Sequence, residues 1–505
     1  MSTAVAAEKP KKNAIVAYFE DFKVLKDNPK EYWGVQAVNV LDSTAYFAMF
    51  QTAMLYLTKD AGFSPIHAGY VYTLFSSIIT VAMLASGVVT DMLGVRKSLW
   101  VSLSVKAIFS VALGMLGVVQ SVPGRRALIV VALVCIAPML AMMQTVFQAA
   151  NVRFTSQRSR SAGFNLWYLF MNAGAFLSGI VIDGLRLHYH KPVSWIVGFG
   201  AITSILSLVV TIGAIRSDHQ VYGPGETKDE KPKSEASGAP KKGAITRLHE
   251  MTRERAFWRF IALTAVLLGV RAVFLEIGLL MPNYWIEVMG KDAPIGALSM
   301  INPFLIVTGL ILFIPLSNKW SVFRMLTVGA VISSLSLFVL MVPWHAFTAI
   351  GGSQSGVMQE VAGKAVVASP FMLAHFWMSA IMMVVLSIGE VIWSPKLSEY
   401  TAAIAPKGQE GAYLGMSMMP WFIAKMAVSA LSGHMINRWS PEGMGKKLEA
   451  GLLDFWHSPA AMWLILGIWA ISGPVIAMLA EKWFTEGAHF SNEAEAKEPV
   501  AEAAE

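Results

Sequence analysis

The sequence contains little charge and almost no cysteine. Charged residues make up 14% of its 505 residues, whereas a soluble domain has about 25%. The single cysteine, Cys135, leaves no disulfide framework and no cysteine-based metal site, and we expect it to be a small packed side chain. Hydrophobic residues, in contrast, make up 55% of the chain, and the mean hydropathy is +0.54. This composition predicts a membrane protein and disfavours a soluble enzyme.

The short motifs of several protein classes are also missing. The chain has no H-E-x-x-H, no G-x-S-x-G and no Cys/His cluster, and its ten histidines are scattered, which disfavours a membrane enzyme. It has no G-x-x-x-x-G-K-[ST], which disfavours a primary pump. The net charge of +7 accompanies no groove-reading motif, so we expect no nucleic-acid partner. The first 30 residues lack the apolar core of a signal peptide. We expect no cofactor and no metal.

Apolar runs long enough to cross a bilayer, about 20 residues each, recur along the chain. We expect twelve transmembrane helices, near 33–57, 66–90, 98–120, 127–149, 162–184, 193–215, 257–281, 296–318, 323–344, 370–394, 410–434 and 459–481. The first is the least apolar, which suits a helix that lines a cavity. The sequence therefore predicts an all-α membrane protein.

A polar segment divides these helices six and six. Residues 216–256 are rich in Lys, Glu, Gly, Pro and Ser and cannot bury a core. We therefore expect a cytoplasmic N-terminal tail (1–30), an N-terminal six-helix bundle (31–215), a cytoplasmic linker (216–256), a C-terminal six-helix bundle (257–481) and a disordered cytoplasmic tail (482–505). Two related bundles are typical of transporters with a binding site near the membrane midplane.

Basic residues predict the orientation. If the N-terminus is cytoplasmic, the inside segments carry 26 of the 40 Lys and Arg residues and the outside segments carry 10. Because cytoplasmic loops carry the excess of positive charge, we expect both termini in the cytoplasm. We expect the protein to lie in the lipid bilayer of a bacterial cytoplasmic membrane as a multi-pass protein that acts as a monomer.

The stretch GVVTDMLGVRK (87–97) joins the second and third expected helices. Gly87 would permit close helix contact, Asp91 could meet a helix N-terminus or a basic partner, and Gly94 allows a tight turn before Arg96 and Lys97. The stretch resembles the loop signature of the major facilitator superfamily, G-x-x-x-D-x-x-G-R-K, with the basic pair one residue late. The resemblance implies the major facilitator fold and a loop that regulates conformational change.

Three further stretches resemble the proton-coupled oligopeptide transporter family within that superfamily. RSAGFNLWYLFMNAGAFLSG (160–179) is similar to the fifth-helix signature F-Y-x-x-I-N-x-G-S, and MINPFLIV (300–307) is similar to the Asn-Pro that opens the eighth helix. VVLSIGEVIWSPKLSEY (384–400), with APKGQEGAYLGMSMMPWF after it, is similar to G-E-x-x-x-S-P through A-P-x-x-x-x-G-x-x-x-G. The matching positions are Tyr168, Asn172, Gly174, Gly389, Glu390, Ser394, Pro395, Ala405, Pro406, Gly411 and Gly415.

Glu390 lies near the end of an apolar run, where a charge facing lipid would cost about 3 kcal/mol. It should therefore face protein or water. The resemblance implies that it faces the central cavity, where it receives the free amine of the substrate or takes part in proton coupling. The alternative is a structural ion pair with a basic residue such as Lys425.

The first helix departs from the family pattern E-x-x-E-R-F-x-Y-Y. The chain has NVLDSTAYF (39–47), in which Asp42 is the one carboxylate and the arginine is absent. The lysine of the family's fourth helix is also absent from 142–144. In the family these two cations would pair with the peptide carboxylate, so their loss argues against ordinary recognition of di- and tripeptides.

Other charges within the expected spans could take over these roles. We consider Asp42, Glu276 and Glu390 as proton-coupling candidates and Lys106 and Arg271 as counter-charges. Lys106 could instead form a structural pair with Asp42 or lie next to lipid, and Glu276 could belong to a gate ion pair. Arg271 and Glu276 are five residues apart and therefore about 140° apart around a helix, so we do not expect them to form an ion pair within it.

The substrate-binding candidates are Glu390, Tyr46, Tyr168, Asn172, Lys425 and Trp421, although packing is the better interpretation of each aromatic residue taken alone. The sequence predicts a proton-coupled secondary transporter that moves a small amine-bearing solute by alternating access. The solute would be a peptide or an amino-acid derivative. The alternatives are an exporter or facilitator of an unrelated organic solute, or a sensor that binds its ligand without transport.

Overall fold

The computed structural model describes residues 22–216, 221, 253, 255–313, 320–351, 357–361, 364–367, 369–404 and 419–486. Most of the expected linker lies outside these residues. So do the motif positions Ala405, Pro406, Gly411 and Gly415.

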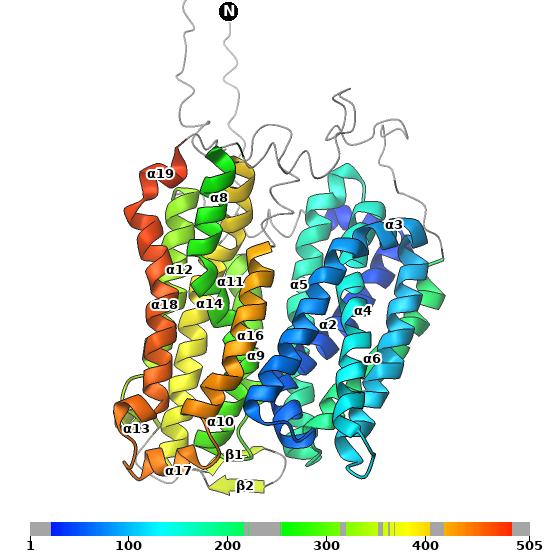
Figure 1. Ribbon diagram of the computed structural model, residues 1–505. Coiled ribbons are helices and arrows are strands. Elements are labelled where there is room, and N and C mark those ends of the chain that lie inside the picture. Colours follow the sequence, from blue (N-terminus) through cyan, green and yellow to red (C-terminus); the bar gives the residue numbers. More distant parts are fainter. Residues whose placement is uncertain are drawn as a thin grey trace, which may run out of the picture.

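The long helices form two groups that stand side by side (Figure 1). The N-terminal group contains α2 (Lys30–Leu55), α3 (Pro65–Val118), α4 (Arg125–Arg153), α5 (Gln157–Asp183) and α6 (Val193–Ala214). The C-terminal group contains α8 (Arg255–Val266), α9 (Leu268–Leu279), α10 (Met281–Met289), α11 (Ile295–Phe313), α12 (Val322–Val339), α14 (Pro370–Ile404), α16 (Met419–Trp439) and α18 (Pro459–Leu479). We call the end at which α6 ends and α8 begins the linker end, and the opposite end the distal end.

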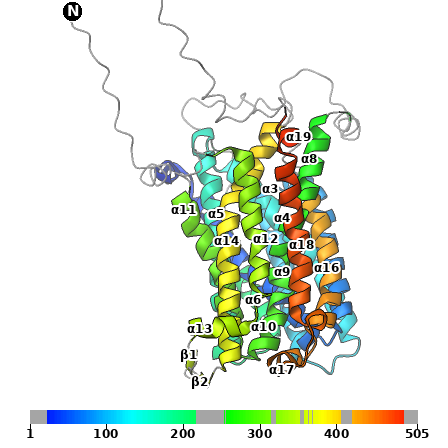
Figure 2. The same cartoon turned by 90° about the vertical axis from the view of Figure 1, so that its left-hand side faces the viewer.

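Short elements close the ends of these helices. They are the 3-10 helices η1 (Phe22–Asp27), η5 (Trp344–Phe347) and η6 (Phe455–His457), the π-helical turns η2 (Tyr56–Asp60) and η3 (Gly184–His188), and the short helices α13 (Thr348–Gly351), α17 (Met444–Glu449) and α19 (Glu481–Thr485). An antiparallel hairpin of β1 (Val357–Val361) and β2 (Lys364–Val367) lies at the distal end, outside the helices (Figure 2). The sequence did not predict this hairpin, because its strands are short and lie between two apolar runs.

Serine residues begin several of the helices. Ser64 precedes α3 and accepts a hydrogen bond from the backbone N–H of His67, with Pro65 at the first helical position. Ser156 and Ser159 form a reciprocal capping box at the start of α5, and Ser321 caps α12. Such caps supply acceptors to the N–H groups that have no partner inside the helix.

Eight helical segments in the described part are long and apolar enough to cross a membrane, or nine if α8 and α9, which are bent by 43°, form one span. Two of the eight lie on α3. A helix covers part or all of each of the twelve expected ranges, and α14 extends ten residues beyond its expected end at 394. The protein is an integral multi-pass membrane protein with a helical membrane region, whereas the number of twelve spans stays a prediction.

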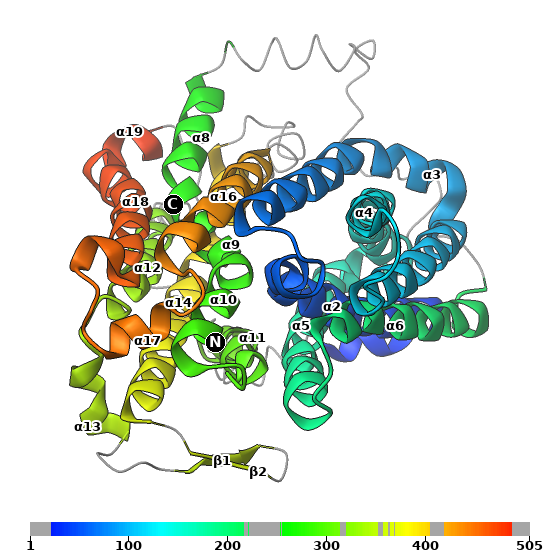
Figure 3. The ribbon, with the colours of Figure 1, turned by 60° about the horizontal axis from the view of Figure 1, so that its bottom comes forward.

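The two groups contact each other through α3 with α16, α5 with α11 and α2 with α9. Viewed from the distal end, these helices lie along the boundary between the groups (Figure 3). At Gly69 of α3, a Cβ atom would lie 3.1 Å from the Cα of Gly433 on α16, so the two backbones approach closely. A side chain at Gly69 would push the two helices apart by a few tenths of an ångström, so glycine favours this close contact.

Candidate functional site

Glu390 lies on α14 and is hydrogen-bonded to the neighbouring helix α11. The amide nitrogen of Asn302 donates to the Glu390 carboxylate over 2.7 Å and to the Ser387 hydroxyl over 3.1 Å. Ser387 and Glu390 are three residues apart and share a helix face. Glu390 is partly exposed, as a residue that meets substrate or water would be.

Gly389 explains why Glu390 points in this direction. A Cβ atom at Gly389 would clash with Ser333 and with the backbone of Gly329, both on α12. The glycine therefore lets α14 lie directly against α12, and the next residue points about 100° away around the helix. The Gly-Glu pair of the sequence motif thus combines a helix contact with an outward-pointing carboxylate.

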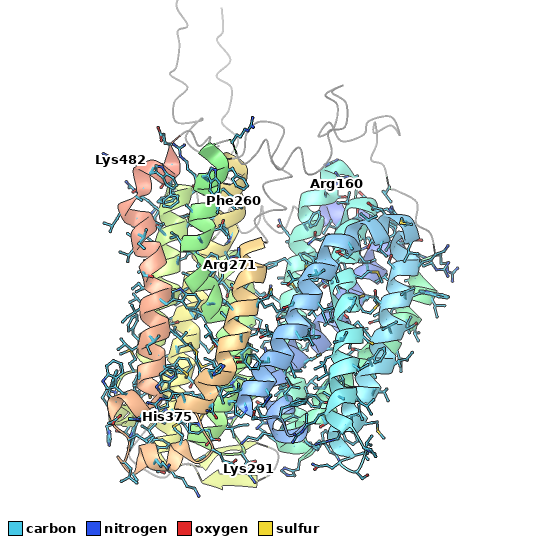
Figure 4. All side chains as sticks on the ribbon, in the orientation of Figure 1. Arg160, Phe260, Arg271, Lys291, His375 and Lys482 are labelled. Atoms are coloured by element: carbon cyan, nitrogen blue, oxygen red, sulfur yellow. The ribbon has the colours of Figure 1, made fainter. Side chains whose placement is uncertain are left out.

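Arg271 of α9 lies beside the same part of α14. Its guanidinium is 5.7 Å from the ring centre of Trp393, which is three residues after Glu390. The Trp393 indole donates to the Ser333 hydroxyl over 3.2 Å, which fixes the ring. Arg271 and Glu390 are close enough to interact electrostatically. Figure 4 shows Arg271 between Lys482 at the linker end and Lys291 at the distal end.

Tyr168 is a residue of the N-terminal group that lies near Glu390. Its hydroxyl lies close enough to the Glu390 carboxylate for an electrostatic interaction. Asn172, one turn later on α5, donates to the Tyr168 backbone carbonyl over 2.9 Å. At Gly174 a Cβ atom would clash with Val40 and Ser43 of α2, so this motif glycine allows α5 and α2 to pack closely.

Asp42 and Lys106 form an ion pair inside the N-terminal group, between α2 and α3. Their side chains are only 6% and 4% exposed. A buried ion pair of this kind compensates two charges that would each be expensive alone. Of the alternatives open at Lys106, the structure therefore shows the pair with Asp42.

Glu276 and Lys425 are the other two charged candidates. Glu276 on α9 is 1% exposed, and its Oε2 atom has no hydrogen-bond partner among the described residues. Lys425 on α16 is 6% exposed, and within the described part of the chain no hydrogen bond or ion pair of its ammonium is found. The alternative ion pair between Lys425 and Glu390 is not observed. Glu390 instead accepts a hydrogen bond from Asn302 and interacts electrostatically with Arg271.

Within the described residues, no observed contact brings Tyr46 to Glu390. Tyr46 stacks on Phe50, with ring centres 6.2 Å apart, and Phe50 packs against Gly278 of the C-terminal group. Trp421 belongs to α16, but its side chain lies outside the described residues.

The predicted loop at 87–97 is a kink within α3. Gly94 has φ of 78°, which is the left-handed conformation needed for the expected tight turn. At Gly87 a Cβ atom would meet nothing within 4 Å, so no close helix contact is made there in this structure. Asp91 and Lys97 are exposed. Arg96 lies 5.5 Å from the Trp100 ring and reaches the Arg216 carbonyl over 3.5 Å, at the end of the N-terminal group.

A second polar cluster joins the two groups at the distal end. Both carboxylate oxygens of Asp183 at the end of α5 accept from the backbone at the start of α11, over 2.8 Å from Gly296 and 2.7 Å from Ala297. Arg186 donates to the carbonyls of Lys291 and Ala293 over 2.8 and 3.0 Å. We call these four contacts the distal latch.

Sequence reasoning did not assign a function to Asn302 or Asp183. The Asn-Pro motif was a signal for Asn302, since an amide inside an apolar helix needs a partner. Asp183 gave no such signal, because a carboxylate near a helix end is ordinary. No group of three or more His, Cys, Asp or Glu side chains suited to a metal ion occurs among the residues described.

The fold and the charged cluster between its two halves define a helical membrane transporter. The model of the Major Facilitator Superfamily matches residues 33–362, and the chain belongs to this superfamily. It is accordingly a transporter and not an enzyme. No curated protein matches the chain significantly.

Solved structures of peptide transporters share the fold. The peptide transporter POT in complex with sulfate aligns with a TM-score of 0.64 at 16% identity, covering 91% of this chain and 96% of that one. A POT family transporter in complex with a thioalcohol-conjugated peptide aligns with a TM-score of 0.63 at 15% identity, covering 92% and 100%. Another, in complex with 5-aminolevulinic acid, gives 0.62 at 15% identity, covering 90% and 97%. At these identities the similarity establishes the fold alone.

Proposed function

We propose that this transporter is a proton-coupled secondary transporter for a small amine-bearing solute. In this proposal twelve helices cross a bacterial cytoplasmic membrane with both termini in the cytoplasm. Residues near 31–215 and 257–481 act as two bundles that rock against each other, and a single chain is sufficient. The solute is a peptide-like or amino-acid-derived compound, and protons drive its movement.

The observation that carries this proposal is the position of Glu390. Its carboxylate is partly exposed and is held by Asn302, and Tyr168 approaches it from the other group. An anion held between two moving halves can pair with an ammonium group in one state and take up a proton in another. Both events would neutralise the same carboxylate, which is the minimum requirement for coupling.

Glu276 supports a second proton site. A charged carboxylate buried without a hydrogen bond or cation is expensive, and no partner of the buried Glu276 Oε2 atom is found in the part of the chain that the structure describes. We propose that Glu276 holds a proton in the state observed here and releases it when α9 moves. Asp42, in contrast, is paired with Lys106, so we propose a lesser role for it in coupling.

The contacts between the groups favour an inward-open state. In the described part of the chain, the hydrogen bonds and the ion pair found between the groups lie toward the distal end. They are the distal latch, the 3.0 Å contact between Tyr70 and His434, and the 3.9 Å pair between Lys59 and Glu287. If the linker end is cytoplasmic, as the basic residues predict, this arrangement closes the outside and leaves the inside free to open.

A thermal-shift screen of the purified protein tests the proposed substrate class. The ligands are amino acids, di- and tripeptides and amine-bearing metabolites, each at two pH values. A ligand that binds the folded protein raises the unfolding temperature by mass action. We expect stabilisation by free-amine compounds, lost in Glu390→Gln but retained in Glu481→Gln, whose carboxylate pairs with Arg324 at the linker end. Stabilisation by compounds without an amine, unchanged in Glu390→Gln, would contradict the proposal and favour the transport of an unrelated organic solute.

A further inference from the structure

The positive charge of Arg271, close to Glu390, limits which substrates the site can bind. Arg271 lies over Trp393, one turn along α14 from Glu390, and residues three apart on a helix have Cβ atoms about 5–6 Å apart. The site therefore offers an anion and a cation next to each other, from α14 and α9. A bare amine placed against Glu390 would also meet the positive charge of Arg271. A group that carries both charges close together could contact both side chains with matching charge.

Among the described residues, no charged side chain of the N-terminal group is found in contact with Glu390. Asp42 and Lys106, which lie inside this group, neutralise each other. The group's contribution near Glu390 is the neutral hydroxyl of Tyr168. Lys106 is therefore not available to a substrate carboxylate that lies far from its amine.

Resting on the proposed function, we infer that the substrate carries an α-amino-acid head group. Its ammonium binds Glu390 and its carboxylate binds Arg271, while Tyr168 contacts the uncharged remainder. Each residue added to an extended chain moves the carboxylate about 3.3–3.6 Å further from the ammonium. A dipeptide therefore fits the adjacent charges of this site less well than a single amino acid.

Lys425 is a second cation that could bind the substrate carboxylate, and binding there would favour peptides over single amino acids. It is buried on α16, and no partner for its ammonium is found within the described residues. If a distal carboxylate were recognised there, peptides would bind better than amino acids. The experiment must therefore separate Arg271 from Lys425.

Matched ligand sets provide this test. For phenylalanine, leucine, serine and lysine, the free amino acid, its amide and its alanyl dipeptide are titrated against the wild-type protein, Arg271→Lys and Lys425→Met by calorimetry. Arg271→Lys keeps the positive charge but loses the planar two-point contact with a carboxylate. For at least one set we expect the amino acid to bind tenfold or more tightly than its amide and its dipeptide. We expect Arg271→Lys to weaken that binding at least tenfold and to leave the amide within twofold.

The other results overturn the inference. Dipeptides that bind as tightly as amino acids, or lose their binding in Lys425→Met, would place the carboxylate elsewhere and leave the proposed function intact. Free amino acids that bind equally well with and without the Arg271 guanidinium would show that Arg271 does not read the carboxylate. If no amine in any set binds to the wild-type protein or raises its unfolding temperature, the proposed function itself fails together with this inference.

Discussion

The charged residues of the membrane region include two kinds, those in buried ion pairs and those that are partly exposed. Asp42 and Lys106 are paired and deeply buried, whereas Glu390 is partly exposed and held by an amide. The sequence indicated that Glu390 should avoid lipid. It could not indicate which acid has a cation beside it, because partners on different helices depend on how the helices rotate and pack.

A double-mutant cycle at Asp42 and Lys106 tests whether the pair is structural. Lys106→Met leaves a buried carboxylate without its cation, so we expect a loss of about 3–5 kcal/mol in the free energy of unfolding. Asp42→Asn combined with Lys106→Met removes both charges and should recover most of that loss. The measurement is denaturant unfolding in detergent. A double variant no more stable than Lys106→Met alone would show that the two residues do not act as a pair.

At the scale of helices, small residues decide which faces meet. Gly389 lets α14 lie on α12, Gly174 lets α5 lie on α2, and Gly69 meets Gly433 between the two groups. The sequence motifs predicted Gly174 and Gly389 as significant positions. They did not predict the distal latch, because Asp183 binds backbone N–H groups, which every helix start offers.

The distal latch should set the balance between the open and closed distal end. Asp183→Ala removes a helix-capping carboxylate, which is worth about 1 kcal/mol, so we expect the closed population to fall about fivefold relative to the open one. Spin labels at Tyr189→Cys and Leu452→Cys, both exposed and on opposite groups at the distal end, report the distance in a Cys135→Ser background.

Asp454→Ala is the matched control for the latch. Asp454 is a distal carboxylate that bonds to His457 in its own group, over 2.7 Å. The hydrogen bonds from His457 lower the pKa of Asp454, so this control also removes a full negative charge. An unchanged distance distribution in Asp183→Ala, or an equal change in Asp454→Ala, would contradict the role of the latch.

At the scale of the molecule, the apolar runs and the polar segment at 216–256 indicated a two-part helical membrane protein, and a membrane-spanning fold of this superfamily is what the structure shows. Composition could not indicate how far the two groups separate at either end. That depends on contacts such as Tyr70–His434 and Asp183–Gly296, which join residues more than 100 positions apart.

Rocking of the two groups predicts opposite changes at the two ends. A second label pair, Met92→Cys on the N-terminal group and Leu479→Cys on the C-terminal group, uses two highly exposed positions near the linker end. Conditions that lengthen the distal distance, such as Asp183→Ala, should shorten the distance between these labels. Distances that lengthen together would indicate separation of the groups rather than alternating access.

Proton-driven uptake into proteoliposomes tests the central claim most directly. The wild-type protein, Glu390→Gln and the control Glu481→Gln are compared with a labelled amine ligand from the screen, with the external pH varied from about 5 to 8. We expect uptake by the wild-type protein and by Glu481→Gln to rise as the external pH falls. Glu390→Gln, which no longer binds the amine, should keep its fold and show only background uptake at every pH. Normal pH-dependent uptake by Glu390→Gln would contradict the role of Glu390, and ligand binding without any flux would identify a sensor instead of a transporter.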